Sequence, residues 1–520
     1  MPKKIAMIGA GSVVFCKTLM SDILATPALA DSEFVLMSPT ESKLRRMEAF
    51  GQRMVRDNGL PGSVRATTDR SEAIRDADFV VVMIQVGGFD AYGVDYEIPL
   101  KYGVDQCIGD TLGPGGIFRG QRHIPVLIDI AHDMETLAKP GAIMLQYANP
   151  MAANCLALGK ATDVSFVGLC HGVQGAQHQI AACVEHWARR EGMISEEEKI
   201  SQKEIDFVFS GINHQTWCVK ATWRGIDLIP MMLDLFKGHA KFPETEKVRI
   251  DVLKRFGHYS TESNGHLSEY LPWYRKRLDQ ITNWIDMSTW INGETGGYLR
   301  VCTEGRNWFE TDFPNWMAQE APRFTPDKRS EEHGSYIIEG METGRVYRGH
   351  FNVVNKGHIP NLPDGCIIEI PGYVDRNGLN MPVVGALPLA CAATCNVSVR
   401  VQEMSVKAAV TGDALLLKQA MLHDPLTGAI CDPEEVWQMT DEMLIAGEEW
   451  LPQYVASGAI ASAKAALAQH EADGTRVKTM DGFRGMARLD TKTVEEMAVA
   501  KEEARANAQA ADKGKMTANA

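Results

Sequence analysis

The sequence Ile5-Ala6-Met7-Ile8-Gly9-Ala10-Gly11-Ser12 decides the fold at the N-terminus. A short apolar strand leads directly into a Gly-x-Gly turn, and residues 14–24 then have the apolar spacing of a helix. Gly9 permits the tight turn, and Gly11 lets backbone N–H groups approach a pyrophosphate at the helix N-terminus. An ordinary strand–helix connection could also have this turn. Its N-terminal position favours a dinucleotide site with Gly9, Gly11 and Ser12 as cofactor-binding residues.

Strands and helices alternate through residues 1–195, which predicts a doubly wound parallel sheet of the Rossmann type. The apolar segments after the first strand are residues 33–37, 78–84, 143–147 and 165–170. The strict alternation stops near residue 195, and we expect a mixed α+β domain over residues 196–454. Residues 455–520 are rich in Ala, Lys and Glu, which predicts a helical or disordered tail. The predicted fold class is therefore α/β.

The composition excludes several classes of function. The net charge is −14 and no basic cluster interrupts it, so nucleic acid is not an expected partner. No run of 18 apolar residues is present, so we expect no membrane span. Met1-Pro2-Lys3-Lys4 leads into a strand rather than an export signal, and the 11 cysteines have no regular spacing. These features predict a cytoplasmic protein with reduced thiols.

The cofactor half of the sequence departs from the usual NAD pattern at one informative position. An acid that binds the ribose hydroxyls normally ends the second strand, but Ser38 stands there. Serine can bind a ribose, yet it does not repel a 2′-phosphate, so the preference for NAD over NADP is weakened. The glycine-rich residues 109–116 predict a loop that lines the cofactor–substrate cleft, with Asp110 as a further cofactor contact.

Two later segments carry side chains suited to metal binding and proton transfer. Cys170 comes at the end of a predicted strand, and His214 follows a second apolar segment. A buried core residue is the ordinary interpretation of each, but a thiolate and an imidazole also suit a divalent transition metal. A further group of four polar residues has helical spacing, which predicts one face of proton-transfer groups or simply a solvated polar face: Glu262, His266, Glu269 and Tyr270.

Together these motifs resemble glycoside hydrolase family 4, the NAD- and Mn-dependent glycosidases, and within it the α-galactosidase (melibiase) branch. The similarity extends from residue 4 to about residue 454 and includes the glycine turn, residues 110–116, 167–175, 211–214 and 261–273. It implies a fold like that of lactate and malate dehydrogenases, NAD and Mn²⁺ or another divalent metal as cofactors, and a homo-dimer or homo-tetramer.

The resemblance also implies an unusual hydrolysis by redox, elimination and addition. Hydride leaves sugar C3 for NAD⁺, which makes the C2 proton acidic, and the metal bound at O2 and O3 stabilises the enolate. The C1–O bond then breaks by elimination, water adds back and the hydride returns. NAD is regenerated, so the reaction has no net redox change.

The family match assigns roles to individual residues. Cys170 and His214 would be the metal ligands, and Asn149 would bind the sugar near its O2/O3 edge. His171 stands where phospho-sugar relatives carry their proposed acid, so it is the candidate for protonating the leaving group. His266 stands where those relatives place a tyrosine base. Since the residue type differs, Tyr270 and Glu262 remain alternative bases.

The same match narrows the substrate. Phospho-sugar branches carry an arginine that binds the 6-phosphate, and Tyr92 stands there in this sequence. A tyrosine cannot supply the bidentate charge of a guanidinium, so we predict an unphosphorylated α-glycoside, with Tyr92 as a substrate-binding residue. Gly172 replaces the serine usual in the melibiase form and resembles members that cleave uronides. An α-galactoside is the first choice, and an α-glucuronide or α-galacturonide is the alternative.

Two other classes of protein would share parts of this pattern. An NAD-dependent dehydrogenase of the malate or lactate type would have a related N-terminal domain, but it needs no pair like Cys170 and His214. A sensor of sugars or nucleotides would bind without turnover. Hydrolysis without net NADH production would distinguish the glycosidase from both.

Overall fold

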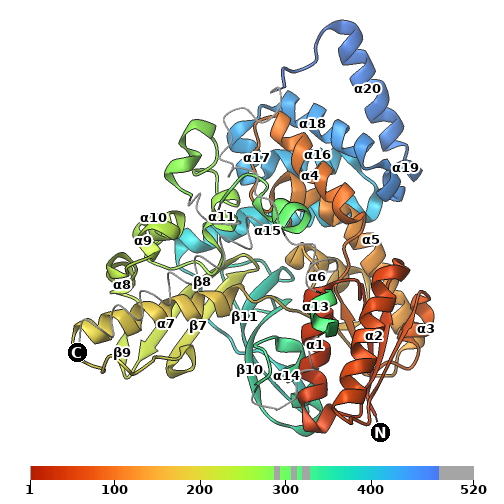
Figure 1. Cartoon of the computed structure of the whole chain (residues 1–520). Helices are drawn as coiled ribbons and strands as arrows, with labels where there is room; N and C mark the ends of the chain where they lie inside the picture. Colours follow the sequence, from red (N-terminus) through yellow and green to blue (C-terminus); the bar gives the residue numbers. More distant parts are fainter. Residues whose placement is uncertain (1, 286–292, 306–312, 319–327, 480–520) are drawn as a thin grey trace.

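The computed structural model describes residues 2–285, 293–305, 313–318 and 328–479 (Figure 1). Its centre is one twelve-stranded sheet in the order β3-β2-β1-β4-β5-β6-β10-β11-β7-β8-β9, with β12 paired to β11. The first six strands are parallel. They are β1 (Lys4–Ile8), β2 (Glu33–Met37), β3 (Ser63–Thr67), β4 (Phe79–Val82), β5 (Ile143–Gln146) and β6 (Ser165–Gly168).

Helices cover both faces of this parallel part, as the alternation in the sequence predicted. On β1, Ile5 and Met7 belong to one core cluster, whereas Ala6 and Ile8 belong to another on the opposite face. The helices that connect the strands are α1 (Val13–Ala25), α2 (Glu41–Asp57), α3 (Arg70–Ile74), α4 (Gly88–Lys101), α5 (Gly113–Leu137), α6 (Met151–Ala161) and α7 (Gly172–Arg190). The strand order reverses between β1 and β4, where ligands bind in open sheets of this kind.

The second half of the sheet is antiparallel and continues the first half directly. It contains β7 (Ile205–Ile212), β8 (Gln215–Trp223), β9 (Ile226–Asp227), β10 (Tyr347–Val354), β11 (Ile367–Asp375) and β12 (Gly378–Asn380). β10 meets β6 through the pair Asn352 and Gly168, and β11 meets β7 through Glu369 and Gly211. The predicted α/β class is therefore confirmed, with mixed strands extending the parallel sheet.

The C-terminal helices gather in a layer with α4 and α5 (Figure 1). They are α15 (Leu389–Thr411), α16 (Ala414–His423), α17 (Pro425–Ile430), α18 (Pro433–Ala446), α19 (Pro452–Ala456) and α20 (Ala459–Asp473). The shorter helices between β9 and β12 are α8 (Met232–Gly238), α9 (Phe242–Thr245), α10 (Lys247–Phe256), α11 (Asn264–Glu269), α12 (Gly297–Arg300), α13 (Phe313–Ala318) and α14 (His333–Thr343). Of the predicted tail, residues 480–520 lie outside the described residues, and α20 forms most of the rest.

The glycine-rich residues 109–116 are only partly the loop that the sequence predicted. Helix α5 already begins at Gly113, with a proline in its first turn, where the missing N–H costs nothing. A Cβ on Gly116 would lie 2.3 Å from the Thr111 carbonyl carbon. The glycines here therefore allow the helix start to pack on the preceding turn, and only the residues before Gly113, including Asp110, form the loop.

Two global features follow from the described part of the chain. No helix within it is long and apolar enough to cross a lipid bilayer. All 11 cysteines are free thiols.

Candidate functional site

Three segments bring a thiol, an imidazole and a carboxylate together at one edge of the sheet. Cys170 follows β6, His214 lies in the turn between β7 and β8, and Glu262 precedes α11. The Cys170 Sγ is 3.5 Å from His214 Nε2, and His214 Nε2 is 3.7 Å from a Glu262 carboxylate oxygen. The ligand atoms of all three lie within 4.8 Å of one another. The structure thus places Cys170 and His214 side by side and adds Glu262 to them.

The surroundings of this cluster suit a divalent transition metal. His214 and Glu262 are buried, and Cys170 is partly buried. Among the residues that the structure describes, the buried His214 Nδ1 has no hydrogen-bond partner. Burial lowers the pKa of His214, which keeps the imidazole neutral and able to donate a lone pair. Burial also raises the pKa of the Cys170 thiol. A thiolate and a carboxylate held here together would need a cation between them, and this donor set fits such an ion.

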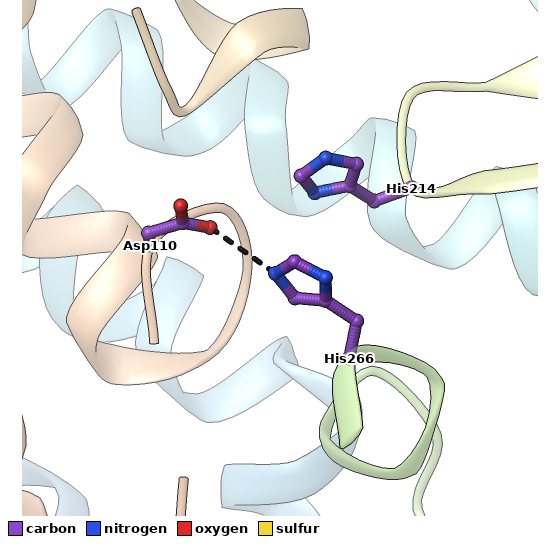
Figure 2. Close-up of side chains that lie close together, drawn as sticks. All are labelled: Asp110, His214 and His266. Atoms are coloured by element: carbon purple, nitrogen blue, oxygen red, sulfur yellow. Dashed lines mark ion pairs between the residues drawn. The ribbon is translucent and has the colours of Figure 1, made fainter. Parts of the chain in front are cut away.

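His266 pairs with Asp110 next to His214, as Figure 2 shows. Its Nδ1 lies 2.8 Å from Glu262, and its Nε2 lies 3.6 Å from Asp110. Burial opposes a charge on this ring, but the contacts with the two carboxylates outweigh burial and raise the pKa of His266 to about 10. Asp110, His214 and His266 form a second group of potential metal ligands that shares His214 with the first.

The helix predicted to carry the proton-transfer groups is shorter in the structure than the sequence indicated. Helix α11 covers only Asn264–Glu269, because the Ser263 side chain caps its first turn and Pro272 stands just beyond its end. Glu262 therefore precedes the helix, and Tyr270 is its C-cap. Tyr270 still belongs to the site: its ring stacks on His214 at a centroid distance of 6.1 Å, and its hydroxyl is buried and makes no hydrogen bond within the described part of the chain.

Asn149 lies beside Asp110, one of the potential metal ligands. The Asn149 side chain donates a 2.8 Å hydrogen bond to Asp110. The Asn149 carbonyl contacts a ring nitrogen of His123 at 2.7 Å and accepts a 3.2 Å hydrogen bond from Arg119. Asp110, which the sequence assigned to the cofactor, therefore also lies beside Asn149 and His266.

The glycine turn lies at the same edge of the sheet and has the shape of a dinucleotide cradle. Gly9 has a φ of +88°, and a Cβ there would lie 2.6 Å from the Met83 carbonyl oxygen, so only glycine fits. A Cβ on Gly11 would approach Ser38 Oγ at 3.5 Å, and Ser12 is the N-cap of α1. Phe15 on α1 lies 5.6 Å from the His171 ring, which connects this turn to the metal cluster.

His171 stands at the exposed rim beside Cys170. Its side chain is 55% exposed, and its Nδ1 lies 3.4 Å from Glu332, whose contact raises the pKa of the imidazole. The neighbouring Gly172 leaves room for the metal cluster, because a Cβ there would lie 2.1 Å from a Glu262 oxygen. The glycine that departs from the melibiase form therefore borders Glu262.

Tyr92 is more deeply buried than a substrate contact usually is. Its hydroxyl donates to the Ile108 carbonyl oxygen, and the Arg119 guanidinium lies 5.2 Å from its ring centroid. The sequence interpretation missed Arg119, which is 7% exposed and lies on α5 beside Asn149. Its Nη atoms make no hydrogen bond to any described residue. An arginine on a helix is usually a surface residue in a sequence, so no local signal marked it.

Two buried glutamates were also missed as site residues. Glu369 on β11 accepts a 2.7 Å hydrogen bond from Thr216, two residues after His214, and burial raises its pKa to about 7. Glu269 on α11 accepts hydrogen bonds from the backbone N–H groups of residues 107, 108 and 109, at 2.5, 3.0 and 2.9 Å. The sequence grouped Glu269 with the proton-transfer face, but it holds the loop that carries Asp110.

Comparison with known proteins agrees with this geometry. The model of the Family 4 glycosyl hydrolases matches residues 4–186, and the model of their C-terminal domain matches residues 209–427. An α-galactosidase of Rhizobium meliloti (strain 1021) is 53% identical over 97% of this chain and 99% of its own length. An α-galacturonidase of Bacillus subtilis (strain 168) is 30% identical over 85% of this chain and 96% of its own length.

A solved structure extends the likeness to the fold. It is a 6-phospho-α-glucosidase from gut microorganisms, solved in complex with NAD and Mn²⁺. The TM-score is 0.69 at 19% identity, and the match covers 87% of this chain and 100% of that one. Both chains therefore share one architecture along most of their length.

Proposed function

Since this chain belongs to family 4 of the glycosyl hydrolases, we propose that it hydrolyses unphosphorylated α-galactosides with NAD and a divalent metal as cofactors. The observation that carries the proposal is the cluster of Cys170, His214 and Glu262 beside the glycine turn. The α-galactosidase that is 53% identical supports the choice of sugar. When bound, the nicotinamide accepts and returns a hydride, and the metal ion acts as a Lewis acid on the sugar oxygens.

Individual residues of this chain take the other roles in binding and catalysis. Cys170 and His214 hold the metal, with Glu262 as a third ligand. Asn149 binds the sugar hydroxyls near the metal, and its bond to Asp110 fixes the orientation of its amide. His171, on the exposed rim, protonates the oxygen of the leaving group.

Tyr270 is the group we assign to removal of the C2 proton. Its hydroxyl is buried, meets no hydrogen-bond criterion with any described residue and belongs to a ring that stacks on His214. The two nitrogens of His266 instead face Glu262 and Asp110, so this imidazole serves better to position both carboxylates than to accept a proton. The Tyr270→Phe variant tests the assignment, because it keeps the stacked ring and removes only the oxygen.

An unphosphorylated substrate fits the position of Tyr92, whose hydroxyl is already bonded to the Ile108 carbonyl. An α-galacturonide is the second candidate, and one observation favours it. The guanidinium of Arg119 is nearly buried beside Asn149, where it could bind a sugar carboxylate as a bidentate partner. The 30% identical α-galacturonidase supports this alternative as well.

A panel of aryl α-galactoside, α-galacturonide, α-glucoside and α-glucuronide tests the proposal, with NAD⁺, Mn²⁺ and a thiol reductant present. Release of the aglycone from the galactoside, dependent on both cofactors and without NADH accumulation, is the expected result. Steady NADH accumulation would instead indicate a dehydrogenase, and no release from any glycoside would indicate a binding protein. If the galacturonide is cleaved, Arg119→Met should impair its cleavage more than that of the galactoside, because both substrates lose the Arg119 bond to the Asn149 carbonyl but only the galacturonide also loses the carboxylate contact.

Two properties of the whole protein belong to the same proposal. A homo-dimer or homo-tetramer is expected, and light scattering of the purified protein measures it. A cytoplasmic location fits the 11 free thiols, which a reducing compartment protects, and cell fractionation checks it.

A further inference from the structure

One corner of the dinucleotide site lacks the acid that would reject a 2′-phosphate. β2 ends at Met37, and the next residue is Ser38, which is 5% exposed. The Ser38 Oγ accepts a 3.2 Å hydrogen bond from the backbone N–H of Thr40, which fixes its position. A carboxylate at this corner would bind both ribose hydroxyls and repel a phosphate, whereas a neutral hydroxyl does neither strongly.

A cation borders the same corner. A Cβ built on Gly11 would lie 3.5 Å from Ser38 Oγ and 3.9 Å from both Cβ and Cδ of Lys43. Ser38, Lys43 and the glycine turn therefore surround one small space. Lys43 lies in the first turn of α2, directly after the corner where β2 ends.

The two acids of α2 that are closest in sequence to this corner pair with an arginine. Glu41 and Glu48 both pair with Arg45, at 3.3 and 3.0 Å. Arg45 therefore partly compensates their negative charges, which weakens their repulsion of a phosphate beside Ser38. Because the whole chain carries a net charge of −14, a local cation such as Lys43 favours the binding of a doubly charged phosphate.

We propose that this corner accepts a 2′-phosphate, so that the dinucleotide site binds NADP⁺ as well as NAD⁺. Ser38 hydrogen-bonds the ribose, and the Lys43 ammonium pairs with the phosphate as a point charge. The inference rests on the proposed function, which makes this turn the cofactor site. It assigns to Ser38 and Lys43 the choice between the two dinucleotides.

Isothermal titration calorimetry with NAD⁺ and NADP⁺ tests the proposal on protein freed of bound nucleotide. The wild-type Kd for NADP⁺ should lie within about 30-fold of that for NAD⁺. Ser38→Asp should weaken NADP⁺ about 100-fold, because two like charges then meet, and should leave NAD⁺ within about fivefold. Lys43→Gln should weaken NADP⁺ about tenfold and spare NAD⁺. Arg56→Gln, in the last turn of the same helix and far from this corner, is the matched control and should change neither.

The outcomes separate this inference from the proposed function. If NAD⁺ binds and NADP⁺ is weaker by more than about 30-fold, the phosphate corner is wrong and the cofactor assignment stands. If neither dinucleotide binds, both are overturned. An unchanged NADP⁺ affinity in Ser38→Asp also overturns the role of Ser38. Retained NAD⁺ binding shows that the Ser38→Asp variant is folded. If it does not fold, the comparison of Lys43→Gln with Arg56→Gln decides.

Discussion

Replacing Glu269 by glutamine should disconnect the Asp110 loop from α11. The two carboxylate oxygens of Glu269 accept three backbone N–H groups: one oxygen contacts residues 107 and 108, and the other contacts residue 109. A glutamine keeps one oxygen, but its NH₂ group must then face a backbone N–H. At least one hydrogen bond is lost, and two donors are left opposed.

The magnitude follows from these contacts. A hydrogen bond to a charged group contributes about 1.5–3 kcal/mol, and a buried N–H left without a partner costs about 1–3 kcal/mol. The net loss is smaller than these two values together. Burial disfavours the charge of Glu269 and raises its pKa, and a neutral glutamine avoids this penalty. We therefore expect the interaction between Glu269 and the loop to weaken by about 1–3 kcal/mol. If the whole loss affects the population of loops with Asp110 in its productive position, kcat/KM drops roughly 5- to 150-fold.

The assay measures kcat and KM for an aryl α-galactoside together with urea unfolding. Glu269→Asp keeps the charge on a side chain shorter by one methylene, so it should recover part of the lost kcat/KM. Glu448→Gln is the surface control, since its partner Lys464 is exposed as well and the pair is worth little. Wild-type kcat/KM within twofold and unchanged unfolding in Glu269→Gln would refute the positioning role.

Three further results are expected. Cys170→Ser should abolish metal-dependent hydrolysis while urea unfolding stays as in the wild type, because the thiolate is a ligand and contributes little to the core; full activity would remove it from the metal site. Chelation by EDTA should stop hydrolysis and added Mn²⁺ should restore it, and activity that is indifferent to EDTA would contradict a metal-dependent reaction. Asp95→Ala should lower the free energy of unfolding by about 3–5 kcal/mol, because it leaves the buried Arg122 guanidinium without its paired carboxylate. A loss below about 1 kcal/mol in urea unfolding would show that Arg122 finds another partner.

The fold of the N-terminal half was predictable because its signals are local. The apolar β1, the turn at Gly9 and the helix after it are neighbours in the chain, so backbone sterics and alternating burial decide them together. The end of α11 was not predicted correctly, because a cap at Ser263 and the proline at 272 outweighed the helical spacing of polar residues.

The candidate site was predictable where strand ends carry the residues. Cys170 follows a parallel strand, and such ends meet at one edge of a sheet. Arg119 and Glu369 gave no such signal, since each belongs to a regular helix or strand and becomes a site residue only through its burial.

The sequence by itself determined the dinucleotide turn, the parallel, doubly wound class of the N-terminal sheet and the family to which the chain belongs. The tertiary structure alone decided that Glu262 joins Cys170 and His214, and that Glu269 binds the loop at residues 107–109, 160 or more positions away. These contacts join segments that are remote in the chain. Their geometry depends on how the completed sheet and helices pack, which no local pattern encodes.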